Sequence, residues 1–181
     1  MRQVSLSTLF FFALLLGLPL ACGKNARNST GQASQLYTGK ENKRKVILSF
    51  PAKNQAGFVG VEREIFATVS LVSQAKQILL LLMAGPLGNE KQAAGPFGPS
   101  ATYREVFIDG KGLAVLDLPM ATVQTLPGGT SGEVATLYSI VRTLTANVTG
   151  VGRVQILVDG QVSASLAGHV DTQDPLTLAD F

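Results

Sequence analysis

The sequence predicts an α+β domain in which two helices pack on one face of a mixed sheet of about five strands. The first observation is the stretch 129–160, GTSGEVATLYSIVRTLTANVTGVGRVQILVDG, which is typical of a helix followed by a buried strand. The second is a pair of alternating apolar segments at 46–50 and 58–66. The third is a hairpin pattern around residues 109–112. The predicted order is strand, strand, helix, hairpin, helix, strand.

The first half of the domain contains two strands and a helix. Residues 46–50 form a short apolar segment that Pro51 ends, and residues 58–66 alternate in polarity, so both predict strands. Residues 69–83 predict a helix that Gly85-Pro86 terminates. The apolar residues expected on the buried side of this helix are Val72, Ala75, Leu79, Leu82 and Met83.

The second half begins with the hairpin. Strands are expected at 103–108 and 113–118, because the glycines of the intervening Asp109-Gly110-Lys111-Gly112 permit the positive φ angles that tight turns need. Thr130 and Glu133 then have the spacing of a capping box at the start of the next helix. The predicted buried stripe of this helix is Val134, Leu137, Val141 and Leu144. Thr136, Ser139, Arg142 and Thr143 are expected to face mostly away.

The chain divides into an exported leader, a tether and one folded domain. Residues 1–21 combine a basic start, an apolar run and a final small residue, which predicts a signal peptide; an uncleaved membrane anchor is the alternative. Cys22, the only cysteine, follows in Leu18-Pro19-Leu20-Ala21-Cys22, which resembles the lipobox of bacterial lipoproteins although proline stands where leucine is usual. The resemblance implies that a lipid is attached at Cys22. The alternative is an unmodified cysteine in a conventionally cleaved or retained leader. Residues 22–45 are then a flexible tether and 46–181 the domain.

Charge is unevenly distributed along the chain. The tether carries six basic residues against one acidic residue, whereas the domain carries a net negative charge. The overall charge of +3 therefore does not indicate nucleic-acid binding. A basic tether beside a lipid anchor would be attracted to anionic headgroups, or would simply keep the linker solvated.

The candidate chemistry is sparse. His169 is the only histidine, which excludes metal sites and mechanisms that need two histidines. His169 and Asp171 lie two residues apart, either satisfying turn backbone or serving a small-ligand or hydrolytic site. No phosphate-binding glycine loop or nucleophile elbow is present, so no catalytic residue, metal ligand or cofactor is predicted.

One candidate interaction surface is predicted on the first helix. Leu80 and Leu81 lie partly off its buried stripe, and Phe97 lies in the proline- and glycine-rich loop that follows. These residues are either covered by neighbouring strands and loops or form a surface for a partner.

The order of several motifs resembles the sporulation and spore germination (GerMN) domain family over about residues 46–175. The motifs that carry the resemblance are Leu82–Pro86, Phe107–Leu118, Gly132-Glu133, Thr143–Thr145, Val154–Gly160 and Leu166–Asp171. The resemblance implies a fold similar to the ring-building motif and a structural or assembly role in the cell envelope without established chemistry. The sporulation protein of this family carries two such domains in tandem, and the motifs occur once here.

Together, these patterns predict a non-enzymatic, membrane-anchored envelope lipoprotein. Its expected partners are the membrane, through the lipid, and either an unknown envelope protein or another copy of the chain. Neither nucleic acid nor a small-molecule substrate is expected. A small-ligand-binding or hydrolytic domain that uses the His169–Asp171 segment is the alternative.

Overall fold

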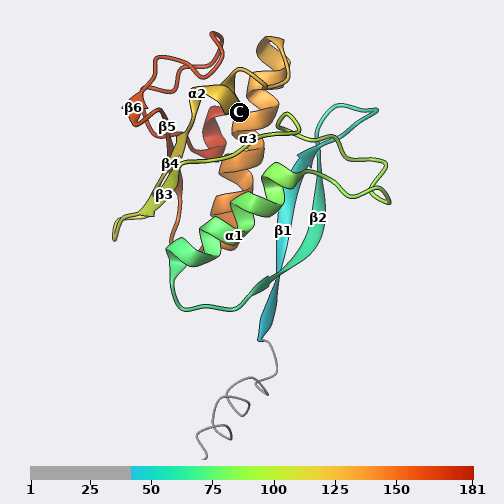
Figure 1. Cartoon of the computed structure of the whole chain (residues 1–181), viewed down its shortest axis with the longest axis vertical. Helices are drawn as coiled ribbons and strands as arrows, with labels where there is room; N and C mark the ends of the chain where they lie inside the picture. Colours follow the sequence, from blue (N-terminus) through green and yellow to red (C-terminus); the bar gives the residue numbers. More distant parts are fainter. Residues whose placement is uncertain (1–41) are drawn as a thin grey trace, which may run out of the picture. The chain divides into compact units, whose positions relative to one another are not determined.

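A computed structural model of the chain describes residues 42–181 (Figure 1). The predicted signal peptide, Cys22 and most of the predicted tether lie outside the described residues. No helix within 42–181 has the length and apolar character needed to cross a membrane.

The α+β class and the predicted order of elements are confirmed. The elements are β1 (Lys43–Pro51), β2 (Phe58–Phe66), α1 (Leu71–Ala84), β3 (Glu105–Ile108), β4 (Leu113–Leu118), α2 (Met120–Val123), α3 (Gly129–Asn147), β5 (Arg153–Val158), β6 (Gln161–Val162) and a 3-10 helix, η1 (Leu178–Asp180). The strands form two sheets instead of one. β1 and β2 form an antiparallel pair, and the second sheet has the order β3-β4-β5-β6, in which only β4 and β5 run parallel.

The two long helices lie between the two sheets (Figure 1). Helix α1 contacts β1, β2 and β3, and α3 contacts β1 and β5. The sequence pattern indicated which side of each strand is apolar, but not that β1 and β2 pair only with each other. Because an isolated two-stranded sheet is marginal in water, this pair depends on the helices beneath it.

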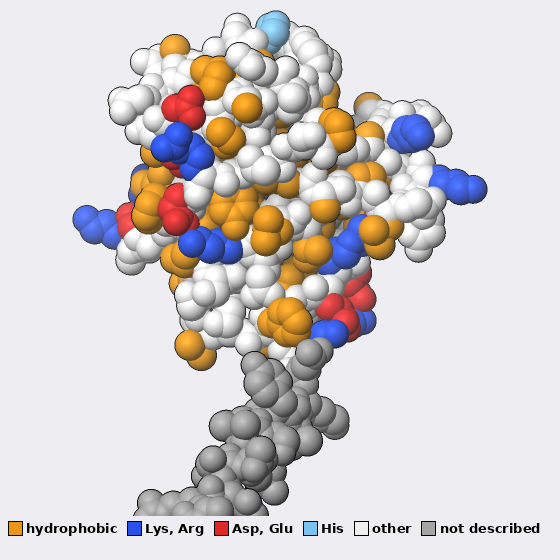
Figure 2. Space-filling model, in the orientation of Figure 1, with side chains coloured by type: hydrophobic (Ala, Val, Ile, Leu, Met, Phe, Trp, Pro, Cys, Tyr) orange, Lys and Arg blue, Asp and Glu red, His pale blue; other side chains and the backbone are white. Residues whose placement is uncertain are grey.

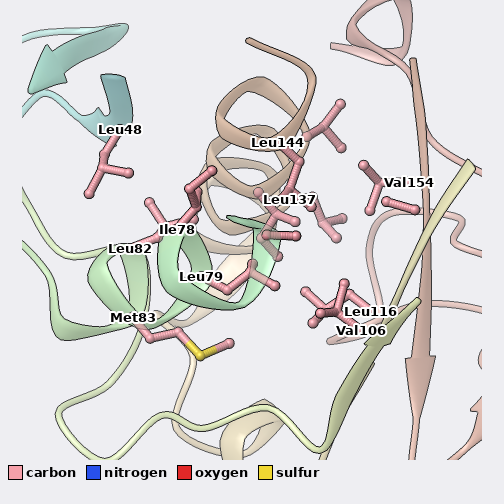
Figure 3. Packing of buried hydrophobic residues seen from close by; sticks show 14 of the residues in the cluster. Leu48, Ile78, Leu79, Leu82, Met83, Val106, Leu116, Leu137, Leu144 and Val154 are labelled. Atoms are coloured by element: carbon pink, nitrogen blue, oxygen red, sulfur yellow. The ribbon is translucent and has the colours of Figure 1, made fainter. Parts of the chain in front are cut away.

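The core fills the space that the helices share with both sheets (Figure 3). Leu79 of α1 and Leu137 of α3 are fully buried, as are Leu48 of β1 and Leu116 of β4. The predicted burial of Leu137 and Val141 is confirmed. One continuous core therefore joins the small sheet to the large one through the helix layer.

Helix α3 is buried on more sides than its apolar stripe predicted. Thr136, Ser139 and Thr143 were expected to face away from the core, yet all three are buried. The second sheet explains this difference, because β1 and the loop after α1 cover that side of the helix. The Thr143 hydroxyl oxygen accepts a hydrogen bond from the Ser49 backbone N–H at 3.0 Å. The Thr136 hydroxyl donates to the Pro96 carbonyl at 2.6 Å.

Strand β1 starts at Lys43, three residues before the predicted domain boundary. Arg44, assigned to the tether from the sequence, donates hydrogen bonds to the Gln74 side-chain oxygen and the Asn147 carbonyl, both at 2.7 Å. Lys45 forms an exposed ion pair with Glu62 at 2.7 Å. Three of the basic residues assigned to the tether therefore belong to β1.

The predicted hairpin turn is confirmed between β3 and β4. An Asp109 carboxylate oxygen accepts hydrogen bonds from the backbone N–H groups of Lys111 and Leu113, both at 2.8 Å. Gly112 has a φ of +84°, and a Cβ at this position would lie 2.5 Å from the Gly150 carbonyl oxygen. Glycine is thus required at 112 both by its backbone angle and by the close approach of the turn that follows α3.

Leu137→Ala should lower the free energy of unfolding by about 2–5 kcal/mol, because the truncation leaves a cavity between α3 and the large sheet. Leu80→Ala is the matched control, since the Leu80 side chain is 59% exposed. Urea denaturation followed by circular dichroism measures both variants. Equal destabilisation of the two variants would contradict this assignment of the core.

Candidate functional site

A buried carboxylate on α3 holds the loop that follows β6. Glu133 is fully buried. One of its carboxylate oxygens accepts the backbone N–H groups of Leu166 and Ala167, at 2.9 and 2.8 Å. The other accepts the backbone N–H of His169 at 2.8 Å and lies 3.0 Å from the imidazole Nδ1. The carboxylate thus fixes the 166–169 segment against the helix.

The predicted capping box at Thr130 and Glu133 is wrong. The N-cap of α3 is Gly128, whose residue type offers no side-chain hydrogen bond, and Glu133 lies one turn inside the helix with its acceptors directed at the 166–169 segment. The spacing was correct for a capping box, but the partner of the carboxylate is more than thirty residues away in sequence. Local pattern alone could not indicate this contact.

His169 and Asp171 were expected either to satisfy turn backbone or to form a ligand site, and Asp171 does the former. His169 is bound to Glu133, whereas an Asp171 carboxylate oxygen accepts the backbone N–H of Gln173 at 2.9 Å. Burial of the Glu133 carboxyl favours its neutral form, but the N–H groups of Ala167 and His169 and the imidazole outweigh this and lower its pKa below the ordinary 4.5. A carboxylate with a lowered pKa and several donors already bound is a poor general base.

The described residues offer no clustered metal ligands. Within 42–181, no group of three or more histidine, cysteine, aspartate and glutamate side chains is placed to hold a metal ion.

The predicted surface on the first helix is only partly exposed. Leu80 is 59% exposed, Leu81 is half-buried, and Phe97 is buried at 8% exposure. Phe97 packs into the core and is not available to a partner, which corrects its place in the predicted surface. The loop after α1 holds Phe97 inside, as the Thr136 bond to the neighbouring Pro96 indicates.

A shallow groove runs between β2 and the exposed side of α1. We call it the β2–α1 groove, and its lining residues are Glu64, Ile65, Phe66, Gln77, Leu80 and Leu81. Its volume is about 230 Å³. Phe66 was not predicted for this surface, yet its ring is 55% exposed. The sequence did contain a signal for it: a large aromatic residue occupies a position at the end of the strand where the alternation predicts an exposed, polar side chain.

The groove is held in place by a side-chain amide. The Gln77 side-chain oxygen accepts the Phe66 backbone N–H at 2.8 Å, and its nitrogen donates to the Phe66 carbonyl at 3.1 Å. The end of β2 is thereby fastened to α1. In Figure 2, charged side chains of both signs gather at the lower right, over the start of β1 and the end of β2, beside exposed hydrophobic side chains. The surface is therefore a rigid apolar groove with a charged border.

The fold and the sequence define the family. Residues 35–164 match the sequence profile of the Germane family, described as sporulation and spore germination. Because this match covers well over half of the chain, the protein belongs to that family. Comparison with curated proteins finds no significant match.

Solved structures confirm the fold. A candidate lipoprotein from Clostridium perfringens is 21% identical, with a TM-score of 0.55 over 77% of this chain and 90% of that one. The first GerMN domain of the Bacillus subtilis sporulation protein GerM is 20% identical, with a TM-score of 0.58 over 75% of this chain and 98% of that one. The tandem GerMN domains of GerM give a TM-score of 0.62 at 20% identity over 77% of this chain, which covers only 48% of the tandem structure.

Glu133→Gln should lower the free energy of unfolding at pH 7 by about 1–3 kcal/mol, because the amide leaves a buried donor facing the N–H of His169. The folded-state pKa of Glu133 is lowered, so its stabilisation is fully present above about pH 4.5 and is lost as the pH falls through the folded-state pKa. The difference between wild type and variant should therefore shrink in acid. Urea denaturation between pH 3 and 7 tests this expectation.

Glu62→Gln is the control for Glu133→Gln, because Glu62 is an exposed residue whose ion pair with Lys45 lies in solvent. It should change stability by less than about 1 kcal/mol. A Glu133→Gln protein as stable as wild type at pH 7 would show that the carboxylate does not secure the loop.

Proposed function

We propose that this protein is a membrane-anchored lipoprotein of the bacterial envelope whose domain binds a protein partner without catalysing a reaction. The observation that carries the proposal is the pair Phe66 and Leu80, both more than half exposed and both bordering the β2–α1 groove. Large apolar side chains held on regular elements beside a groove are typical of interaction sites.

The energetic argument is simple. Fully burying a leucine or phenylalanine side chain contributes about 1.5–3 kcal/mol. Because Phe66 and Leu80 are already partly covered, binding would gain roughly half of that from each. The Gln77 bonds to Phe66 mean that the groove needs little ordering when a partner binds. A partner would therefore find a small but pre-formed apolar site.

The proposed anchor depends on Cys22, which lies outside the described residues. The lipobox-like sequence, membership of the Germane family and a fold shared with a candidate lipoprotein support it. About twenty residues separate Cys22 from β1, which gives a root-mean-square reach of roughly 25 Å for a flexible chain. The domain would act on partners within that distance of the membrane: another envelope protein or another copy of the chain.

The alternative is a small-ligand or hydrolytic site at the His169–Asp171 segment, beside which Asp171, Asp174 and Asp180 line a hollow of about 350 Å³. The Glu133 carboxylate that lies there is occupied by backbone N–H groups and the imidazole. The contacts made by this segment hold the fold together, and an interaction role is the function that the described surface favours.

Cys22→Ser should move the protein from the membrane fraction to the soluble fraction or block processing of its leader. Acyl chains hold a protein at a bilayer because each buried CH₂ contributes about 0.8 kcal/mol, and the substitution removes the sulfur that would carry them. Cell fractionation and intact-mass measurement of the mature wild type test this. An unmodified mature N-terminus would refute lipid attachment.

Leu80→Glu should leave the melting temperature nearly unchanged, because the side chain is exposed, and should abolish a complex captured by crosslinking in cells. Val162→Glu is the control, since Val162 is similarly exposed on β6 at 55%. It should retain the complex. If Leu80→Glu keeps both its stability and its partners, the β2–α1 groove is not the interaction site.

A further inference from the structure

Strand β2 has one edge paired and one edge open. Its register with β1 sets Ile47 opposite Glu62 and Ser49 opposite Gly60. The backbone N–H groups of Ile47 and Ser49 donate to side chains of α3, so they point away from β2. In an antiparallel pair, residues opposite such positions also direct their backbone groups outward. Gly60, Glu62 and, two residues further, Glu64 therefore present N–H and C=O groups at the outer edge of β2.

The outer edge of β1, by contrast, is covered. The Asn147 side chain accepts the Ile47 N–H at 2.9 Å and donates to the Ile47 carbonyl at 2.7 Å, as a neighbouring strand would. Thr143 accepts the N–H of Ser49, and the Ala94 N–H donates to the Pro51 carbonyl. The helix and the loop thus leave no room for another strand beside β1.

On β2 such contacts occur at two residues only, Phe66 at the end of the strand and the carbonyl of Glu62 in its middle. Gln77 occupies the backbone groups of Phe66, and the Arg63 side chain donates to the Glu62 carbonyl at 3.1 Å. Among the described residues, no other hydrogen bond is formed by the outward backbone groups between Gly60 and Glu64. An uncovered edge of this kind is a template for pairing with an extended chain.

The open edge lies directly beside the β2–α1 groove. Successive side chains of an added strand point to opposite faces of the sheet. One row would lie on the inner face, where it would pass the ion pair of Arg63 with Glu90 and reach the groove at Ile65 and Leu81. The side chains of this row that enter the groove would therefore be apolar. The other row would lie on the outer face beside the exposed Glu62 and Glu64. Lys45 of β1 is paired with Glu62 and lies opposite Glu64, so two carboxylates face one lysine and the remaining acidic charge favours basic side chains in this row.

We propose that the β2 edge from Gly60 to Glu64 binds an extended segment of another protein in which apolar and basic side chains alternate. Main-chain pairing would supply affinity and the two rows of side chains would supply specificity. This inference rests on the proposed interaction function and names the chemistry of its partner.

A second copy of this chain does not fit the edge equally well. Pairing β2 with β2 of another copy would bring Glu62 and Glu64 close to their own counterparts, and like charges across strands are destabilising. The β1 edge of another copy is covered by α3. Charge and geometry both favour a different protein.

The test uses the full chain and a fluorescent ten-residue peptide in which lysine and valine alternate. Fluorescence anisotropy should show saturable binding. A peptide of the same composition with paired lysines and paired valines should bind at least about tenfold more weakly, and so should a glutamate–valine peptide. Equal binding by the three peptides would overturn the proposal.

Backbone pairing is tested with two N-methylated peptides. Methylation of the backbone nitrogen of every lysine removes the N–H donors along one edge of the extended peptide. Methylation of the backbone nitrogen of every valine removes those along the other edge. Only one edge can face β2, so one peptide should lose binding and the other should retain it. Loss in both or in neither would refute strand pairing.

Variants of the chain test the position of the site. The double variant Glu62→Lys, Glu64→Lys should bind the lysine–valine peptide about tenfold more weakly, because two exposed charge pairs become repulsive. Asp174→Lys is the control for charge, since Asp174 is exposed in the C-terminal segment. It should have little effect. Equal weakening by both changes would show attraction to net charge only and would overturn the proposal.

The remaining outcomes separate this inference from the proposed function. If no peptide binds in the expected pattern but Leu80→Glu still abolishes the crosslinked complex, the interaction function stands and the edge proposal fails. If Leu80→Glu also leaves the complex intact, both fail. Concentration-dependent dimers of the chain that Glu64→Pro disrupts would identify a second copy as the occupant, which also overturns the proposal.

Discussion

The structure depends on a layer of two helices that must pack against a sheet on each side. Helix α3 shows this constraint most clearly, since its leucines face the large sheet while Thr143 and Asn147 supply hydrogen bonds to β1. The small sheet has only two strands and is not expected to be stable alone. Its position, its covered edge and its open edge all follow from how the helices meet it.

This constraint explains which parts of the fold the sequence could predict. Alternation and helical spacing located both long helices and the main strands, because these signals depend on neighbours in sequence. The Asp109 turn was predictable for the same reason. The division into two sheets was not, because it depends on which distant strands pair, and alternation carries no information on that. The buried threonines of α3 were misassigned because a helix between two sheets is covered on two sides, so a residue off the apolar stripe can still be buried.

The candidate site was only half predictable. Leu80 could be recognised as off the buried stripe from its spacing alone, and the structure places it at the surface. Phe97 could not be assigned, because whether a loop residue is buried depends on the surface that the loop covers. The role of Glu133 could not be predicted for a related reason, because the N–H groups that its carboxylate accepts come from a segment far along the chain. In this chain, polar residues that act locally were predictable and those that connect distant segments were not.

The contact between Gly112 and Gly150 has a consequence for how the chain reaches its fold. The β3–β4 hairpin is local, whereas the parallel pair β4–β5 must close around the whole of α3, a non-local step that is slowed by the entropy cost of closing this loop. Gly112 lies where these two events meet, because its carbonyl accepts the N–H of Gly152 at 2.9 Å just ahead of β5. A residue without a side chain thus marks the place at which the local hairpin meets the strand that pairs with it over a long range.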